Sequence, residues 1–372
     1  MSKVMFITSN DLFCANGDGG AKCSQKNYKL LTRSILKNDI KVICIYKDSY
    51  EQMPASVIKI KQPHSDAGLL VANMLGCRRF YPWKFHIFKM LTSKEKYDLV
   101  WLDSSNFGNL VSRIYSGKTV VFFHNIEADY MKNKYVKEGL KFLPAYWAAK
   151  HNEKLAMKAD YIVTLNERDA HLIKDKYGRS VDCIMPIAFE DVFDAERANM
   201  TDIEDNTILF CGSCFGPNID GIEWFIHDVL PFLENTKLVI VGKGFECKKA
   251  QYEAYSKQIE VVGTVDDTSQ YYYAHSIVVM PIRYGSGMKV KTAEAMMFGK
   301  IILATDEALE GYDVEKVDGI FRCNSAQDFI NAYKTVKSNK KGYNGIRKLF
   351  LDKYSINAVQ KTCDNFLKGI VE

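Results

Sequence analysis

The sequence predicts an α/β protein of two domains, each built on a parallel sheet covered by helices. Its 372 residues exceed the about 250–300 at which one hydrophobic core usually stops growing. Short runs rich in Val and Ile recur along the chain, and the segments between them are long enough for the helices that connect buried parallel strands. These runs cover residues 3–8, 41–46, 99–102, 119–123, 161–165, 207–212, 238–242, 259–263, 277–282 and 300–305.

The domain boundary is predicted where this alternation of apolar runs and helical segments stops. Near residues 186–206, Glu, Asp, Ala and Asn replace the apolar runs. We therefore expect an N-terminal domain of residues 1–190 and a C-terminal domain of residues 191–354. The last segment, about 355–372, has a helical pattern and is expected to pack back on the first domain.

Composition excludes several classes of protein. With 47% hydrophobic and 26% charged residues, the chain is neither disordered nor fibrous. A net charge of +5 does not indicate nucleic-acid binding unless it is clustered locally. The N-terminus runs directly into a strand pattern, and no apolar run reaches the ~20 residues that span a bilayer. We expect a cytoplasmic protein whose contact with the inner face of a membrane, if it has one, is peripheral.

The ten Cys are scattered, several of them in apolar runs, which indicates reduced thiols. Cys211 and Cys214 form a C-x-x-C motif. It has no second pair and no nearby His, so we expect no metal, and a redox pair is the minor alternative.

A glycine turn followed by a helical pattern is the strongest candidate site. Ligands of open parallel sheets bind beyond the carboxyl ends of the strands. A helix beginning near Gly287 would direct its unpaired N–H groups and positive end at a diphosphate. Lys291 and Glu294 would share one face of that helix, and a carboxylate can accept the hydroxyl protons of a ribose. An ordinary surface ion pair is the alternative.

Other predicted strands also end in glycines or polar residues. Glycines at residues 212, 242 and 263, and a glycine-rich turn after the first strand, would let a base or phosphate approach the backbone, although each alone is an ordinary turn. His124 stands at the carboxyl end of a predicted buried strand, with Asn125 and Glu127 behind it. A His that is only structurally satisfied is the alternative.

Residues 76–96 combine basic and aromatic side chains. Arg78, Arg79 and two lysines alternate with five aromatic residues, Trp83 among them. This mixture suits a patch that contacts anionic lipid headgroups. The alternative is an amphipathic helix that buries its aromatic rings in the core.

On these motifs the chain resembles a family-4-type glycosyltransferase of the GT-B fold, of the glycosyl transferases group 1, in the bacterial branch that assembles polysaccharides. The resemblance covers nearly the whole chain. It rests on the segments Gly212-Ser-Cys-Phe-Gly-Pro-Asn-Ile-Asp-Gly-Ile-Glu-Trp-Phe, Val229-Leu-Pro, Val262-Gly-Thr-Val-Asp-Asp, the glycine turn with the Glu294 helix, and His124-Asn-Ile-Glu.

The resemblance implies two Rossmann-like domains facing each other across a cleft. It implies a retaining, metal-independent transfer without a cofactor, from a nucleotide sugar such as a UDP- or GDP-sugar on the C-terminal domain. The acceptor, a glycan or lipid-linked glycan, would bind the N-terminal domain. Glu294 matches the second acid of the family's paired-glutamate motif, and the first acid falls on Ser286. The family's Arg and Lys after the first strand of the C-terminal domain are absent, so phosphate charge would fall to other basic residues.

The site implied by these arguments has three parts. The catalytic residues would be His124, Lys291 and Glu294. The donor pocket would be formed by Gly19, Gly20, Gly212, Ser213, Lys243, Gly263, Thr264, Val265, Arg283, Gly285, Ser286, Gly287, Met288 and Lys289. The acceptor or membrane side would be formed by Arg78, Arg79, Trp83, Asn125 and Glu127.

Two other functions remain open on the sequence. A sugar-nucleotide epimerase also binds a UDP-sugar between two such domains, although the segments around His124 and Glu294 fit it poorly; a phosphorylase would need a pyridoxal phosphate lysine that no segment resembles. A non-catalytic nucleotide-sugar-binding module is compatible with Ser286 in place of the carboxylate.

Overall fold

A computed structural model describes residues 2–14, 19–34, 39–48, 50, 53–285, 287–338 and 345–371. The chain forms two compact units. Unit 1 comprises Met1–Ile187 with Val359–Glu372, and unit 2 comprises Ala188–Ala358. Each contains one parallel sheet with helices, which confirms the predicted α/β class with two domains.

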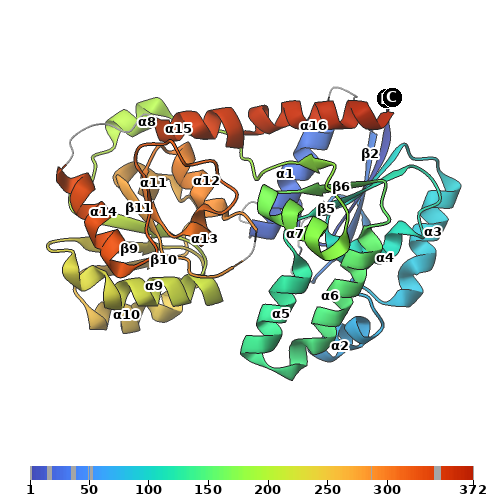
Figure 1. Ribbon diagram of the computed structural model, residues 1–372, viewed down its shortest axis with the longest axis horizontal. Helices are drawn as coiled ribbons and strands as arrows, with labels where there is room; N and C mark the ends of the chain where they lie inside the picture. Colours follow the sequence, from blue (N-terminus) through green and yellow to red (C-terminus); the bar gives the residue numbers. More distant parts are fainter. Residues whose placement is uncertain are drawn as a thin grey trace. The chain divides into compact units, whose positions relative to one another are not determined.

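Unit 1 has a seven-stranded sheet in the order β3-β2-β1-β4-β5-β6-β7 (Figure 1). Its strands are β1 (Lys3–Thr8), β2 (Asp39–Tyr46), β3 (Ile58–Lys61), β4 (Leu99–Leu102), β5 (Lys118–Phe123), β6 (Tyr161–Thr164) and β7 (Cys183–Ile184). Its helices are α1 (Gly19–Arg33), α2 (Asp66–Met74), η1 (Pro82–Lys84), α3 (Phe85–Lys94), η2 (Ser105–Phe107), α4 (Gly108–Val111), α5 (Glu127–Glu138), η3 (Leu140–Phe142), α6 (Leu143–Ala156) and α7 (Glu167–Tyr177).

The strands of unit 1 are buried because helices cover both faces of the sheet, and all four residues of β4 are fully enclosed. The last helix, α16 (Ile356–Val371), contacts this unit over most of its length. The Gln360 side chain donates to the Leu30 carbonyl oxygen at 3.1 Å, and the Phe366 ring meets the edge of Tyr161. Within the described ranges, none of the helices has the length and apolar character needed to cross a bilayer.

Unit 2 has a six-stranded sheet in the order β10-β9-β8-β11-β12-β13. Its strands are β8 (Thr207–Cys211), β9 (Lys237–Val241), β10 (Ile259–Gly263), β11 (Ile277–Met280), β12 (Ile301–Ala304) and β13 (Ile320–Arg322). Its helices are α8 (Ala195–Met200), α9 (Gly216–Asp228), η4 (Leu230–Phe232), η5 (Phe245–Lys248), α10 (Lys249–Tyr255), α11 (Ser269–Ala274), α12 (Val290–Met297), α13 (Asp306–Leu309), α14 (Ala326–Ser338), α15 (Gly345–Leu349) and η6 (Phe350–Tyr354).

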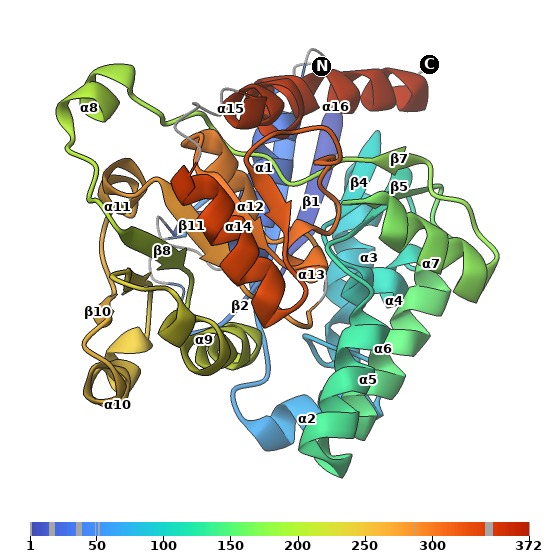
Figure 2. The same ribbon diagram turned by 60° about the vertical axis from the view of Figure 1, so that its left-hand side comes forward.

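Helices cover both faces of the unit 2 sheet: α9 and α10 lie on one side, and α11 and α12 on the other (Figure 2). This arrangement follows from right-handed crossovers, because the chain moves outward from β8 to β10 and then returns to β11. Helix α9 packs closely on the segment that follows β11, since a Cβ built on Gly221 would lie 2.1 Å from the Pro281 carbonyl oxygen. That contact brings the first turns of α9 to the carboxyl ends of the strands.

Candidate functional site

The glycine turn after β11 leads into α12, which begins at Val290 with Lys289 at its N-cap. The helix therefore starts three residues later than the expected start near Gly287. The physical reason is the backbone of Gly287, whose φ of 63° belongs to the left-handed region and cannot form part of a right-handed helix. Ser286 lies outside the described residues, and Met288 is buried.

Lys291, in the first turn of α12, lies against the segment that follows β8. Its ammonium group donates a hydrogen bond to the side-chain oxygen of Asn218 on α9. The Asn218 amide in turn donates to the Ser213 carbonyl oxygen at 2.7 Å. A Cβ on Gly212 would lie 3.0 Å from the Lys291 Nζ atom. The structure thus brings together the expected residues Gly212, Ser213 and Lys291, and adds Asn218, which the sequence analysis did not single out.

The environment of Lys291 disfavours its protonated form. Burial lowers the pKa of Lys291 to about 7, with a contribution from neighbouring Lys289, although Cys211 and Glu294 act in the opposite direction. The ammonium group is therefore only partly charged near neutral pH. An anion that approached Nζ would favour the charged form, and the site would take up a proton as the anion bound.

Glu294 lies one turn further along α12, partly buried and close to two tyrosines. Burial, the Cys211 thiol and the Glu294 carboxylate raise the pKa of Tyr272 well above its usual range. The Tyr312 hydroxyl donates to the Lys289 carbonyl oxygen at 2.8 Å, at the start of the helix. Lys291, Glu294 and these phenols form one polar cluster at the strand ends.

The other basic residues expected at this edge already have carboxylate partners. Arg283 makes a two-pronged ion pair with Asp220, with N–O distances of 3.0 and 2.9 Å. Lys289 lies 2.6 Å from a Glu307 oxygen and also donates to the Gly287 carbonyl oxygen. Arg283 and Lys289 are thus paired with carboxylates, and their contact with the donor's phosphates stays a prediction.

Two more of the expected residues, Gly242 and Thr264, make contacts within the turns themselves. Gly242 has a φ of 144°, and a Cβ there would lie 2.0 Å from the Gly212 carbonyl oxygen, so its close approach is to the neighbouring loop. The Thr264 N–H donates to a Glu246 oxygen at 2.6 Å. Hydrogen bonds from Thr264 and nearby backbone N–H groups lower the pKa of Glu246 to about 2. Glu246 thus links the loops after β9 and β10. It accepts the hydrogen bond of the Thr264 N–H, which was expected to face a ligand.

The remaining expected donor-pocket residues of unit 2 are distributed along the same strand ends. Gly263 is the last residue of β10, Val265 is half-buried beyond it, and the Lys243 side chain is exposed after β9. Gly285 faces Lys289 and Glu307, since a Cβ there would lie 3.1 Å from Lys289 Cε.

In unit 1, His124 follows β5 and lies beside Asp103, which follows the neighbouring strand β4. The His124 Nε2 atom is 3.4 Å from an Asp103 carboxylate oxygen. Asp103 has no exposed surface, and its other oxygen accepts hydrogen bonds from Asn27 at 2.7 Å and Trp101 at 3.3 Å. Asp103 was not predicted from the sequence, although a polar residue directly after a buried strand next to that of His124 is a usable signal.

This pairing sets the charge of both groups. Burial would raise the pKa of Asp103, but His124 and hydrogen bonds from His124, Ser24 and Asn27 hold it below its usual value. Burial would lower the pKa of His124, but Cys23 and Asp103 raise it well above its usual value. His124 is therefore a buried cation at neutral pH.

Gly19 and Gly20 are the first residues of α1 and lie at the same strand ends of unit 1. The Gly20 carbonyl oxygen accepts a hydrogen bond from Asn10, whose amide also donates to Ser24 at 2.8 Å. The glycine turn is thus connected to the hydrogen-bond network around Asp103. The residues of that turn before Gly19, numbers 15–18, lie outside the described ranges.

The expected acceptor-side residues divide into a buried and an exposed group. Arg78 is buried, pairs with Glu127 at 3.6 Å and donates to Asn106 at 3.0 Å. The expectation of a surface contact for Arg78 is therefore wrong, because its charge is compensated inside unit 1. Arg79 and Asn125 are half-buried, whereas Trp83 is 58% exposed and stacks on Tyr81.

The segment 76–96 also places aromatic rings in the core. Phe80 and Phe88 have no exposed surface and belong to the main hydrophobic cluster of unit 1. The core alternative therefore applies to these two rings, and the segment as a whole is not a continuous surface patch.

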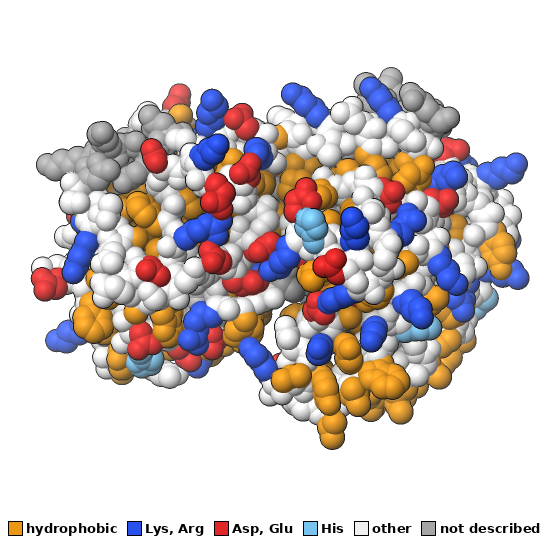
Figure 3. Space-filling model, viewed as in Figure 1, with side chains coloured by type: hydrophobic (Ala, Val, Ile, Leu, Met, Phe, Trp, Pro, Cys, Tyr) orange, Lys and Arg blue, Asp and Glu red, His pale blue; other side chains and the backbone are white. Residues whose placement is uncertain are grey.

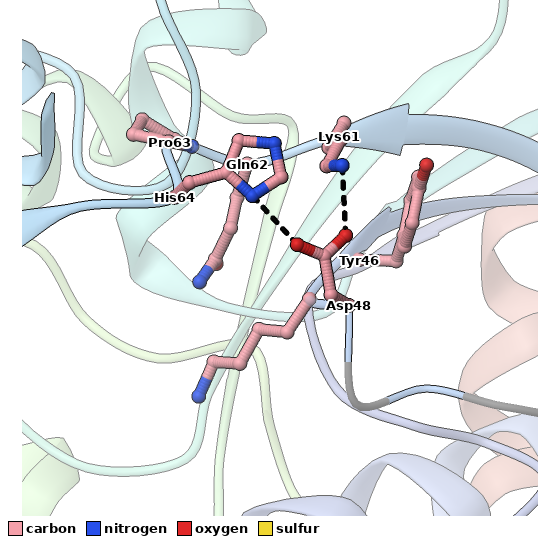
Figure 4. A pocket seen from close by; sticks show the side chains of 7 residues that line it. Tyr46, Asp48, Lys61, Gln62, Pro63 and His64 are labelled. Carbon is pink, nitrogen blue, oxygen red and sulfur yellow. Dashed lines mark ion pairs between the residues drawn. The ribbon is translucent and has the colours of Figure 1, made fainter.

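A small pocket lies beyond the carboxyl ends of β2 and β3, with a volume of about 210 Å³. Figure 4 shows Asp48 between His64 and Lys61, at 2.6 and 2.9 Å. The sequence analysis singled out none of these residues. Since the Asp48 carboxylate has both neighbours as partners, its charge is compensated without a ligand. No group of three or more His, Cys, Asp or Glu side chains arranged to hold a metal ion occurs among the described residues.

Comparison with known proteins agrees with this geometry. Residues 205–339, which contain β8 to α12 and the Lys291 cluster, match the family of glycosyl transferases group 1. Sucrose-phosphate synthase from Thermosynechococcus elongatus superposes with a TM-score of 0.74 at 13% identity, over 100% of this chain and 99% of that one. The chain is a glycosyltransferase of the GT-B fold.

Two further relatives complete the comparison. Anabaena HepE, solved in complex with UDP, superposes with a TM-score of 0.70 at 12% identity, over 99% of this chain and 100% of that one; it was also solved with UDP-glucose. A 44.6 kDa protein in the cps region of Klebsiella pneumoniae is 22% identical, over 91% of this chain and 93% of that protein. The predicted recognition and the predicted enzyme class are thereby confirmed.

Proposed function

We propose that this glycosyltransferase moves a sugar from a nucleoside diphosphate to a glycan or lipid-linked glycan during cell-surface polysaccharide biosynthesis. The observation that carries the proposal is Lys291, a buried amine with a pKa of about 7 at the start of α12. Binding of UDP and UDP-glucose by HepE supports a nucleotide-sugar donor, and the cps-region relative supports a role in polysaccharide assembly.

The proposed chemistry is mainly electrostatic. As the bond between the sugar and the diphosphate breaks, negative charge grows on the leaving phosphate. The Lys291 ammonium group and the positive end of the α12 dipole would stabilise this charge. Glu294, one turn away, would accept hydrogen bonds from the ribose hydroxyls.

We further propose retention of the anomeric configuration without a metal ion or cofactor. The acceptor hydroxyl would lose its proton to the departing phosphate oxygen. The charge of His124 would stabilise the transferred sugar or the diphosphate oxygens during the same step. Since Ser286 replaces a carboxylate that the family usually has, other contacts would have to select the donor sugar.

The test is a transfer assay with UDP-, GDP- and ADP-sugars and lipid-linked glycans from a polysaccharide-producing strain. We expect one donor to be used, the rate to be unchanged by EDTA, and the product's anomeric proton coupling in NMR to match that of the donor. Inverted product would overturn retention, and activity lost in EDTA and restored by a divalent ion would overturn metal independence. A UDP-sugar converted to its epimer without any acceptor would favour an epimerase instead.

We also propose that unit 1 meets the cytoplasmic face of an anionic membrane, through a different surface from residues 76–96. Val136, Leu140 and Trp147 are 71%, 73% and 68% exposed, on or between α5 and α6. Met74, 72% exposed, ends the neighbouring α2. Figure 3 shows hydrophobic side chains gathered on the lower part of unit 1, where Figure 1 draws these helices. Exposed lysines at 132, 137, 141 and 150 accompany them.

Exchanging Leu140 and Trp147 for Ser is expected to weaken binding to phosphatidylglycerol vesicles by about tenfold or more, because two large apolar side chains no longer enter the interface. Co-sedimentation measures this effect. Met200→Ser removes an 85% exposed side chain of unit 2 and should leave vesicle binding unchanged. Equal binding by all variants, or no binding by the unaltered protein, would contradict the proposed surface.

A further inference from the structure

Two thiols meet at the strand ends of unit 2. Cys214 follows β8, and Cys247 lies in η5, after β9. Their sulfur atoms are 3.9 Å apart, although the residues are 33 positions apart in the sequence. The C-x-x-C motif had suggested Cys211 as the partner of Cys214, but Cys211 is buried next to Tyr272.

The backbone holds the two sulfur atoms in this position. The Cys214 N–H donates to the Lys243 carbonyl oxygen at 2.8 Å, so the segment after β8 is bound to the loop that carries η5. The Cys247 N–H donates to the Gly244 carbonyl oxygen within that loop. Cys214 is half-buried and Cys247 is exposed, so a reagent in solution reaches Cys247 first. Formation of an S–S bond needs only a short movement, because a disulfide is ~2.05 Å long.

We propose that Cys214 and Cys247 form a reactive dithiol, which low-molecular-weight disulfides such as oxidised glutathione convert to an intramolecular disulfide. The Cys247 thiolate attacks one sulfur of the reagent, the reagent's S–S bond breaks, and one glutathione leaves as its thiolate and takes up a proton. The Cys214 thiol then loses its proton to solvent and attacks Cys247 Sγ, and the second glutathione leaves. Two protein thiols are oxidised and one glutathione disulfide is reduced to two glutathiones.

The short distance between the two sulfur atoms favours the second step over a lasting mixed disulfide. Burial and the neighbouring Cys247 thiol raise the pKa of Cys214, and the charge of Lys248, the residue after Cys247, opposes that rise. Lys248 is itself fixed by Glu223, at 3.0 Å. Cys214 Sγ lies 3.9 Å from Cys247 Sγ, so its attack on the mixed disulfide is intramolecular.

The test treats the full-length protein with oxidised glutathione, blocks remaining thiols and analyses the digest by mass spectrometry. We expect a cross-linked peptide pair containing Cys214 and Cys247, a net loss of two hydrogen atoms, and full reversal by dithiothreitol. Cys214→Ser should instead accumulate a stable glutathione adduct on Cys247. Cys14→Ser, which removes another half-buried thiol, should cross-link like the unaltered protein.

Two results would overturn the proposal. One is a lasting glutathione adduct on Cys247 of the unaltered protein without the cross-link. The other is cross-linking of Cys214 to Cys211 at equal or greater yield. Neither readout depends on enzymatic activity, so the test is independent of the proposed donor and acceptor.

Discussion

Replacement of His124 by Ala is expected to lower turnover by roughly 10²–10³-fold, the range typical for removing one group that stabilises transition-state charge. The reason is that His124 is a buried cation beside Asp103. Nucleotide affinity, measured separately by calorimetry, should change little because His124 is proposed to act during the transfer step, whereas Lys291 and Glu294 of unit 2 hold the bound nucleotide. His171→Ala, on the exposed surface of α7, is the matched control and should keep full activity.

Asp103→Asn tests whether the carboxylate maintains this charge. The pKa of His124 is raised in the folded protein, so its charge is present below that pKa and is lost as pH rises through it. An amide at 103 removes one of the two contributions that raise the pKa of His124, the other being Cys23, so the alkaline fall in turnover should move to lower pH. A folded variant with an unmoved pH profile would show that Asp103 does not act through His124, and full turnover in His124→Ala would remove the proposed role of His124 altogether.

Lys291→Met is expected to weaken binding of the donor's nucleoside diphosphate by roughly 10- to 100-fold, as loss of a charged hydrogen bond implies. The pKa of Lys291 is about 7 without ligand, so at pH 8 the unaltered protein should take up a proton as the diphosphate binds. Calorimetry in buffers of different ionisation enthalpy measures this uptake, which should disappear in Lys291→Met. Lys243→Met removes an exposed lysine after β9 and should lose much less affinity.

The pH dependence of protein stability gives a second test of Lys291. Because the folded state lowers the pKa of Lys291 from 10.5 to about 7, the fold favours the neutral amine, and stability falls as pH drops from about 10 to about 7 and is constant below that. Lys291→Met should therefore unfold at a higher denaturant concentration than the unaltered protein below pH 7, and the difference should shrink above it. Equal affinity and equal proton uptake in the two proteins would contradict the assignment of Lys291.

The central strands could be predicted from the sequence because burial on both faces demands continuous apolar runs. The run at 99–102 coincides with β4, and that at 277–282 contains β11. The missed strands β3, β7 and β13 have no such pattern: β3 reads Ile-Lys-Ile-Lys and exposes its lysines, and the other two have only two and three residues. All three occupy the edges of their sheets, where fewer neighbours require apolar side chains.

The candidate site was only partly predictable for a related reason. Its position followed from the rule that ligands bind beyond the carboxyl ends of parallel strands, which selected Lys291, Glu294 and His124. The partners of these residues depend on packing between distant segments. Asn218 is 73 positions from Lys291, and no local pattern assigns it; likewise, the ion pair of Arg283 with Asp220 depends on how α9 lies on the sheet.

The most direct test of the account is a crystal structure of the protein with the nucleoside diphosphate of its preferred donor. We expect the diphosphate to lie against the first turn of α12, with a phosphate oxygen within hydrogen-bond distance of Lys291 Nζ and the ribose hydroxyls on Glu294. A diphosphate bound away from α12, or a Lys291 side chain still paired only with Asn218, would contradict it.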